Sequence, residues 1–241
     1  MLVKTKAVVI NHLDYSDSRI IAHVLTPKLG KIPLMVNKNK GRKSNGKAGY
    51  FQSLHLLNLE FSYKEKRNIH QLIDAQIAVP TNDLAVNFHK QNIAILLADI
   101  LNRCIKEMDP NQELFQYVWH AVLMFDKIEK AAFNFHLYFL THLMKYLGFE
   151  PGNQWNNHNK YLDMDSGLFV DDANINSSCL TEKESSIIYR FMNCSADEIP
   201  PNGISNTDRR LVIEAVLSYF DHHIPNFGKL KSYNVLKSVY H

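Results

Sequence analysis

The hydrophobic pattern of this chain changes its period near Pro80, and that change limits the folds it can adopt. Before Pro80, apolar residues recur at every second position in 32–36, 57–63 and 73–79. Alternation predicts half-buried strands, whereas the spacing of three and four residues after Pro80 predicts helices. We therefore expect an α+β chain in which the strands come first and the helices follow.

The N-terminal part predicts a small barrel or sandwich. Further β-branched runs occur at 3–13 and 19–26, and turn residues separate the runs at 27–30 and 66–68. About five short strands in so few residues are typical of a closed or nearly closed sheet. We place the domain boundary near residue 80, between residues 1–80 and residues 81–241.

The C-terminal part predicts a mainly helical domain. One of residues 81–83 can cap a helix whose apolar positions run from Ile93 to Cys104, and further helices are expected at 112–130, 132–147, 182–192, 206–222 and 230–239. Gly148 is placed to end the helix before it, and Thr181 with Glu184 matches a capping box. Residues 150–180 predict a long loop with a small hairpin near 161–169.

Charge is divided unevenly between these two parts. Residues 1–80 contain 13 lysines and arginines against five acidic residues, and the remainder contains 14 against 19, so +8 and −5 give the net +3. No acidic residue occurs between Asp17 and Glu60, although cations are frequent there. Such a stretch attracts polyanions. The leading hypothesis is a nucleic-acid-binding N-terminal domain.

The most cationic segment is residues 38–47, which hold five lysines and arginines in ten residues. Its glycines let the backbone approach a phosphate closely, and its cations would neutralise phosphates and release counterions. Tyr50, Phe51 and Tyr63 are close by in sequence and can stack on unpaired bases. The alternative is a solvated hairpin tip. Binding is favoured because the cations continue onto the flanking strands.

Two motifs resemble sites for phosphate chemistry without completing them. Gly41, Gly46 and Lys47 have the spacing of a nucleotide-binding P-loop, but Ala48 replaces the Ser or Thr that binds magnesium. The triplet 221–223, Asp-His-His, matches a phosphoesterase signature. It closes an expected helix, however, where histidines suit the negative end of the helix dipole.

The remaining candidates for chemistry are acidic residues and cysteines. Asp163, Asp165, Asp171 and Asp172 could hold a divalent cation, although acidic residues in an exposed hairpin are commoner, and we expect no metal and no catalytic constellation. Cys104, Cys179 and Cys194 are odd in number and widely spaced, which favours a reducing compartment. There is no run of about 18 apolar residues, so we expect no membrane span and a cytoplasmic, nucleoid-associated protein.

At several motifs the chain resembles the RecO family of bacterial recombination mediators. The matching segments follow one another along nearly the whole chain: residues 15–19, Tyr-Ser-Asp-Ser-Arg; 25–31, Leu-Thr-Pro-Lys-Leu-Gly-Lys; 39–44, Asn-Lys-Gly-Arg-Lys-Ser; 146–151, Tyr-Leu-Gly-Phe-Glu-Pro; and 230–232, Leu-Lys-Ser. Each motif is weak alone, but their order is specific.

The resemblance implies an N-terminal five-stranded OB-fold barrel, a helical domain, and a non-enzymatic role in DNA repair and recombination. It further implies binding of single- and double-stranded DNA, annealing of complementary strands, and partnership with RecR and the C-terminal tail of single-strand-binding protein. Helping to load the RecA recombinase onto coated strands is also implied. The DNA-binding cations would be Arg19, Lys28, Lys31, Lys38, Lys40, Arg42, Lys43 and Lys47.

One departure from the family pattern concerns zinc. Many members carry four zinc-binding cysteines after the Leu-Gly-Phe motif, whereas residues 150–180 here contain only Cys179. We therefore expect no zinc and no other cofactor, and some other packing must hold this segment. Two other functions stay open: an RNA-binding barrel on a helical scaffold, and a metal-dependent phosphoesterase using Asp221, His222 and His223.

Overall fold

The computed structural model describes residues 1–38, 47–130, 132–152, 155–200 and 204–239. The chain divides into two compact units, Met1–Lys127 with Leu230–His241, and Ile128–Lys229. The expected boundary near residue 80 lies at the end of the last barrel strand, whereas the compact units divide later, after Lys127.

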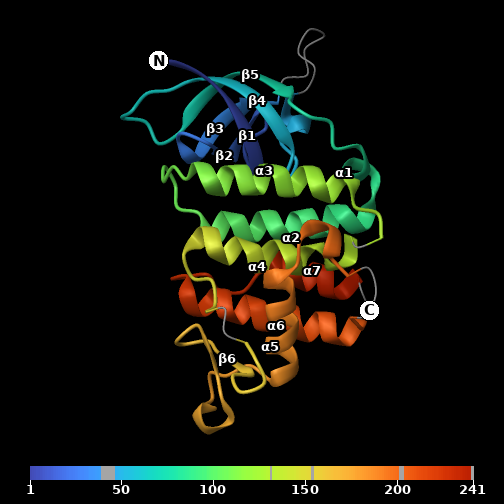
Figure 1. Ribbon diagram of the computed structural model, residues 1–241. Coiled ribbons are helices and arrows are strands. Elements are labelled where there is room, and N and C mark those ends of the chain that lie inside the picture. The colour runs from blue at the N-terminus through green and yellow to red at the C-terminus, as the bar shows by residue number, and fades with distance from the viewer. Residues whose placement is uncertain (39–46, 131, 153–154, 201–203, 240–241) are drawn as a thin grey trace. The chain divides into compact units, whose positions relative to one another are not determined.

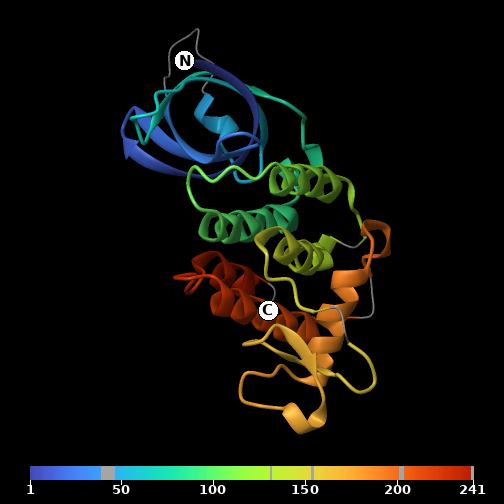
Figure 2. The ribbon, with the colours of Figure 1, turned by 60° about the vertical axis from the view of Figure 1, so that its left-hand side comes forward.

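Five strands of the first unit close into a barrel: β1 (Leu2–Ser16), β2 (Arg19–Thr26), β3 (Gly30–Asn37), β4 (Leu56–Ser62) and β5 (His70–Ile77). Their order around the barrel is β1-β2-β3-β5-β4, and the ring of strands is visible in Figures 1 and 2. The β3–β5 pair is parallel and the other pairs are antiparallel. This is the five-stranded OB-fold, so the expected fold class is confirmed.

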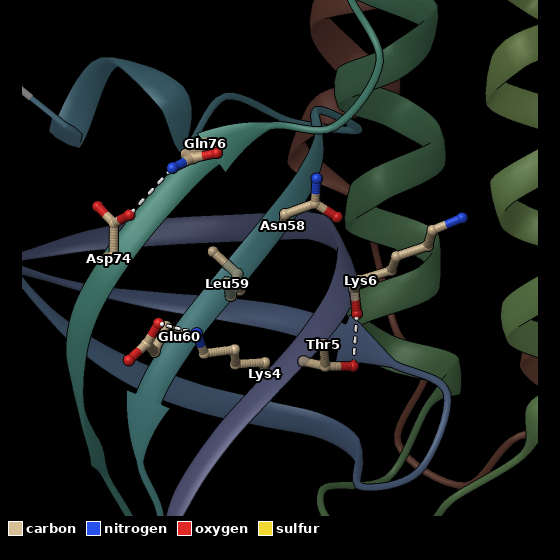
Figure 3. A pocket seen from close by; sticks show the side chains of 8 residues that line it. All are labelled: Lys4, Thr5, Lys6, Asn58, Leu59, Glu60, Asp74 and Gln76. Atoms are coloured by element: carbon tan, nitrogen blue, oxygen red, sulfur yellow. Dashed lines mark hydrogen bonds and ion pairs between the residues drawn. The ribbon is translucent and has the colours of Figure 1, made fainter.

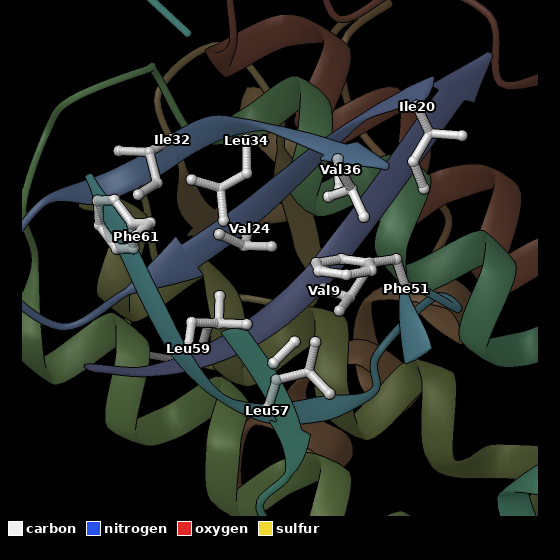
Figure 4. Packing of buried hydrophobic residues seen from close by; sticks show 13 residues of the cluster. Val9, Ile20, Val24, Ile32, Leu34, Val36, Phe51, Leu57, Leu59 and Phe61 are labelled. Atoms are coloured by element: carbon white, nitrogen blue, oxygen red, sulfur yellow. The ribbon is translucent and has the colours of Figure 1, made fainter. Parts of the chain in front are cut away.

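The barrel interior is filled by alternate, inward-facing residues of all five strands. Ile32, Leu34 and Val36 of β3 all have no exposed surface, and they pack with residues of β1, β2 and β4 (Figure 4). Phe51 follows the short helix η1 (Lys47–Tyr50), and its ring is fully buried in this cluster. The prediction that Phe51 stacks on bases is therefore wrong, because its ring fills the barrel.

The first unit also contains four α-helices in its described part: α1 (Asn82–Val86), α2 (Phe88–Cys104), α3 (Gln112–Lys127) and α7 (Lys231–Val239). The structure breaks the single helix expected from residues 81–83 at Asn87. The Asn87 side chain accepts hydrogen bonds from the backbone N–H groups of His89 and Lys90. This N-cap starts α2 afresh, because an Asn side chain satisfies donors that have no partner within the helix.

The turn from β2 to β3 fixes the barrel against a connection between α2 and α3. Gly30 has φ +65, and a Cβ there would lie 2.4 Å from the Asp109 carbonyl oxygen. The Met108 N–H donates to the Lys31 carbonyl at 3.0 Å. Only glycine permits both the left-handed conformation and this close approach.

The second unit contains α4 (Phe135–Leu147), β6 (Tyr161–Asp163), β7 (Leu168–Val170), α5 (Glu182–Asn193) and α6 (Asn206–His223). The expected stop at Gly148, with φ 82, the capping box and the hairpin are confirmed. Ser205 caps α6 in place of Asn206 or Thr207. In the part of the chain that the structure describes, no helix has the length and apolar character needed to span a membrane.

Candidate nucleic-acid interface

A row of outward-facing residues crosses the barrel from β1 to β5. Cross-strand pairing places Leu13 opposite Ile21, Ile21 opposite Met35, and Met35 opposite Gln71. Leu13 is 58% exposed, Gln71 is exposed, and the two residues between them are half-buried. Four strands span about 14 Å at the usual strand spacing. We call this row the cross-strand row.

Tyr15 and Arg19 stand at the β1 end of the cross-strand row. Tyr15 lies at a register shift just before the β1–β2 turn and is 61% exposed, and Arg19 opens β2 and is exposed. Bulges of this kind redirect side chains and often occur beside functional sites. An exposed aromatic ring and an exposed guanidinium that flank the same turn can supply base stacking and phosphate contact.

Lys38 leaves β3 at the same end of the barrel. Its N–H donates to the Ser18 carbonyl at 2.8 Å, and its ammonium pairs with the exposed Asp14 carboxylate. This hydrogen-bonded pair lowers the pKa of the Asp14 carboxyl. A pair so exposed is weak, so a phosphate can replace the carboxylate at little cost.

The β4–β5 loop, residues 63–69, lies at the other end of the cross-strand row. It runs directly into His70 and Gln71 at the start of β5. Lys64, Lys66 and Arg67 are all exposed, and Glu65 is the only acidic residue of the loop. The row thus has cations at both ends. The faces of β2 and β3, between the β1–β2 and β4–β5 loops, form the usual oligonucleotide path on this barrel.

Two of the cations expected to bind DNA lie elsewhere. Lys28 is exposed in the turn between β2 and β3, at the far end of β2 from Arg19, which is roughly 23 Å along the strand. Lys31 is only 6% exposed, and its ammonium donates to the Asn102 carbonyl at 2.6 Å. Desolvation lowers the pKa of Lys31. The Lys31 ammonium is therefore poorly placed to contact a phosphate.

The side chains of the remaining expected cations lie outside the described part of the chain. Lys40, Arg42 and Lys43 lie outside the described residues, as do the two glycines of the P-loop spacing. Lys47 opens η1, and only its backbone is described.

A second groove, on β1, β4 and β5, is less suited to a polyanion. Figure 3 shows Lys4 beside Glu60, whose ion pair is 3.1 Å long, and Gln76 donating to Asp74. The Lys6 ammonium lies 5.1 Å from the centre of the Trp119 ring. Two lysines and two carboxylates line this groove, so its charges cancel, unlike those around the cross-strand row.

Comparison with known families shows which family this chain belongs to. The family model "Recombination protein O N terminal" matches residues 1–80, and the model "Recombination protein O C terminal" matches residues 87–233. The chain belongs to the RecO family. It is similar to proteins named "DNA repair protein RecO" from Flavobacterium psychrophilum, at 31% identity over 241 residues, and from Azobacteroides pseudotrichonymphae genomovar. CFP2, at 30% over 240 residues. Both matches cover all of both chains.

The side chains of Asp221, His222 and His223 do not converge on one site in this RecO-family chain. Asp221 accepts from the Gly228 N–H at 2.9 Å, and His222 Nε2 lies 2.6 Å from an Asp165 carboxylate oxygen. The His223 ring stacks on Phe149 with centroids 5.3 Å apart. Each side chain has a different neighbour, so the geometry gives no support to the phosphoesterase alternative.

The hairpin that follows the Leu-Gly-Phe motif does not have the cysteine ligands of the zinc site expected from the family pattern. Cys179 is its one cysteine, and the Cys179 sulfur is engaged by Asn176, whose N–H lies at 3.4 Å. Zinc needs four ligands in tetrahedral geometry. Among the described residues, no three of His, Cys, Asp and Glu are grouped so that they could hold a metal.

The Asp163 side chain holds this hairpin together through hydrogen bonds. It is 7% exposed and accepts hydrogen bonds from the Ser166 hydroxyl at 2.7 Å and from the Asn176 amide at 3.4 Å. Backbone N–H groups of Asp165 and Ser166 point to the same carboxylate. The Ser166 hydrogen bond lowers the pKa of Asp163. The network therefore requires the ionised carboxylate.

Replacing Asp163 by alanine should lower the free energy of unfolding by about 2 kcal/mol, because several donors lose their acceptor. Chemical denaturation measures this loss. EDTA should leave the melting temperature of the unaltered protein unchanged, and metal analysis should find less than one zinc per ten chains. If EDTA lowered the melting temperature of the unaltered protein as much as the Asp163→Ala substitution does, a metal would hold the hairpin instead.

His70 makes the barrel sensitive to acid. It is 1% exposed, and neither ring nitrogen has a hydrogen-bond partner among the described residues. The Tyr63 and Phe61 rings lie 4.7 and 6.0 Å from it. Burial lowers the pKa of His70, so the folded state disfavours its protonated form.

We expect His70→Phe to reduce the acid sensitivity of the protein. The pKa of His70 in the folded state lies below its unfolded value of about 6.5. The folded protein therefore keeps its full unfolding free energy above pH 6.5 and loses part of it as the pH falls below 6.5, because the unfolded state then binds more protons. The slope of unfolding free energy against pH should fall by up to about 1.4 kcal/mol per pH unit. Urea titrations between pH 5 and 7 measure it, and parallel curves for both proteins would contradict the expectation.

Proposed function

We propose that this chain is a non-enzymatic DNA repair and recombination mediator that binds DNA along the cross-strand row. The observation that carries the proposal is the row itself, a partly exposed and mostly apolar surface with Tyr15 and Arg19 at one end and the cationic β4–β5 loop at the other. Family membership supports the role in repair, because the relatives are named DNA repair proteins.

The proposed mechanism is electrostatic and needs no reacting group. Cations on either side of the row, with Lys40, Arg42, Lys43 and Lys47 of the basic segment, would hold the phosphates of one strand and lower its repulsion for a second. Tyr15 would stack on an unpaired base and keep its pairing edge accessible. Both strands of double-stranded DNA would be held by their phosphates in the same way. Complementary strands held close together would then anneal faster.

Annealing of two labelled complementary oligonucleotides, followed by energy transfer between the labels, tests the proposal. The protein should raise the annealing rate at least tenfold in low salt, and Tyr15→Ala should lose part of this gain while remaining folded. The variant Tyr146→Ala, which removes a tyrosine from α4, is the matched control. An annealing rate unchanged by the protein would overturn the proposal.

One comparison distinguishes the proposed DNA-binding function from the alternative, an RNA-binding barrel on a helical scaffold. The 2′-hydroxyl is what lets a protein distinguish RNA from DNA at a given site. Competition between DNA and RNA strands of the same sequence should favour DNA or show no preference. A tenfold preference for RNA would support the alternative.

We further propose a cytoplasmic, nucleoid-associated protein that works with RecR and with the tail of single-strand-binding protein to help load RecA. Family membership is the support for these partners. Recombinase filament assembly on coated single strands should start sooner when the chain and RecR are both present. Equal lag times with and without the chain would contradict this role.

A further inference from the structure

A recess in the first unit lies between the mouth of the barrel and helices α1 and α2. Its volume is about 580 Å³, within the range of roughly 300–1,000 Å³ that small-ligand sites occupy. One wall is polar and comes from β1 and the segment after η1, and the other is mostly apolar and comes from the helices. The lining residues are His12, Gly49, Gln52, Ser53, His55, Leu84, Ala85, Gln91, Ala94 and Ile95.

The polar wall presents two histidines in the same protonation pattern. His12 Nδ1 lies 2.8 Å from the Phe51 carbonyl, and His55 Nδ1 lies 3.0 Å from the Tyr50 carbonyl. A carbonyl only accepts, so each Nδ1 carries a proton, and a neutral ring with this tautomer has a lone pair on Nε2. Burial lowers the pKa of His55, which keeps this acceptor available at neutral pH.

The apolar wall is suited to a flat, hydrophobic surface. Leu84 and Ala94 are each 3% exposed, and Ile95 is 50% exposed. A ligand that fits both walls has a flat apolar face and an edge that carries hydrogen-bond donors. A nucleobase has this chemistry, with amino or ring N–H donors along its pairing edge.

The recess adjoins both ends of the basic segment 38–47. His12 is two residues before Asp14, which pairs with Lys38 where the segment leaves β3. Gly49 belongs to η1, into which the segment returns. A strand whose phosphates contact Lys38 at one end of the segment would lie close to the β1 residues that lead to His12.

We infer that this recess receives one unstacked base of a bound single strand, with the base edge donating to His55 and its face against Ile95. The inference rests on the proposed function and names a base-binding subsite for it. Such a subsite contributes affinity without neutralising a phosphate. Its loss should therefore leave the salt dependence of binding unchanged.

Two variants test the subsite without removing its supports. His55→Asn keeps an N–H near the position of Nδ1 for the Tyr50 carbonyl and removes the Nε2 acceptor, whereas Ser53→Leu fills the recess. Each is compared with Gln76→Leu in the groove of Figure 3. Melting temperatures establish that all three are folded.

The measurement is fluorescence anisotropy with a ten-nucleotide single strand and with the same sugar–phosphate chain lacking bases. Each recess variant should bind the normal strand about tenfold more weakly, which corresponds to about 1.4 kcal/mol, and should bind the abasic strand like the unaltered protein. Equal affinity of all proteins for the normal strand would overturn the subsite alone. Equal losses on both strands would also overturn it, and failure of the unaltered protein to bind either strand would overturn the proposed function itself.

Discussion

Replacing Phe51 by alanine should lower the free energy of unfolding by about 3–5 kcal/mol. The Phe51 ring has no exposed surface and packs with Val9, Val36 and Leu57 in the barrel core (Figure 4). Removing it leaves a cavity that the closed barrel cannot collapse into, so the lost contacts add to the lost burial.

Urea denaturation followed by tryptophan fluorescence or circular dichroism measures this loss. Gln52→Ala, which alters the exposed neighbour of Phe51, should change stability by less than about 0.5 kcal/mol. If Phe51→Ala also fell within that limit, the ring would not be part of the barrel core, and its assignment as a base-stacking residue would return.

Removing the cations of the β4–β5 loop should weaken binding of single-stranded DNA roughly 100-fold at 0.1 M salt. The estimate follows from three phosphate contacts at about 0.7 of a counterion each. The variant is Lys64→Ala with Lys66→Ala and Arg67→Ala, whose parent side chains are exposed at the end of the cross-strand row.

A second triple variant makes the comparison independent of net charge. Lys127, Lys130 and Lys145 are exposed on or next to the helices α3 and α4, and their replacement by alanine removes the same charge from elsewhere. This control should weaken binding less than threefold. Equal losses for the two variants would mean that total charge, rather than the cross-strand row, governs binding.

The barrel was predictable because its signal is local and repeated. Alternation in 32–36 and 57–63 puts every second side chain inside, and the structure buries Ile32, Leu34 and Val36 accordingly. The helix break at Asn87 was missed, since an apolar period continues across it and only the side-chain cap reveals a new start.

The site was less predictable because it depends on contacts between distant parts of the chain. Nothing near Lys31 in sequence shows that Asn102, 71 residues later, will accept from its ammonium. Lys66 and Arg67 were read only as a turn, although their position beside the start of β5 brings them to the cross-strand row. Tyr15 was missed as an aromatic contact, and the signal that could have found it is its place directly before a turn and an arginine.

The salt dependence of single-strand binding tests the central claim most directly. If five to seven phosphates are engaged, the logarithm of affinity should fall with the logarithm of salt concentration at a slope of about −3.5 to −5. The β4–β5 loop variant should make this slope shallower by about 2, since three contacts are lost. Arg42→Ala with Lys43→Ala should make it shallower by about 1 to 2. A slope near zero for the unaltered protein would contradict the account, because DNA would then not be bound through its phosphates.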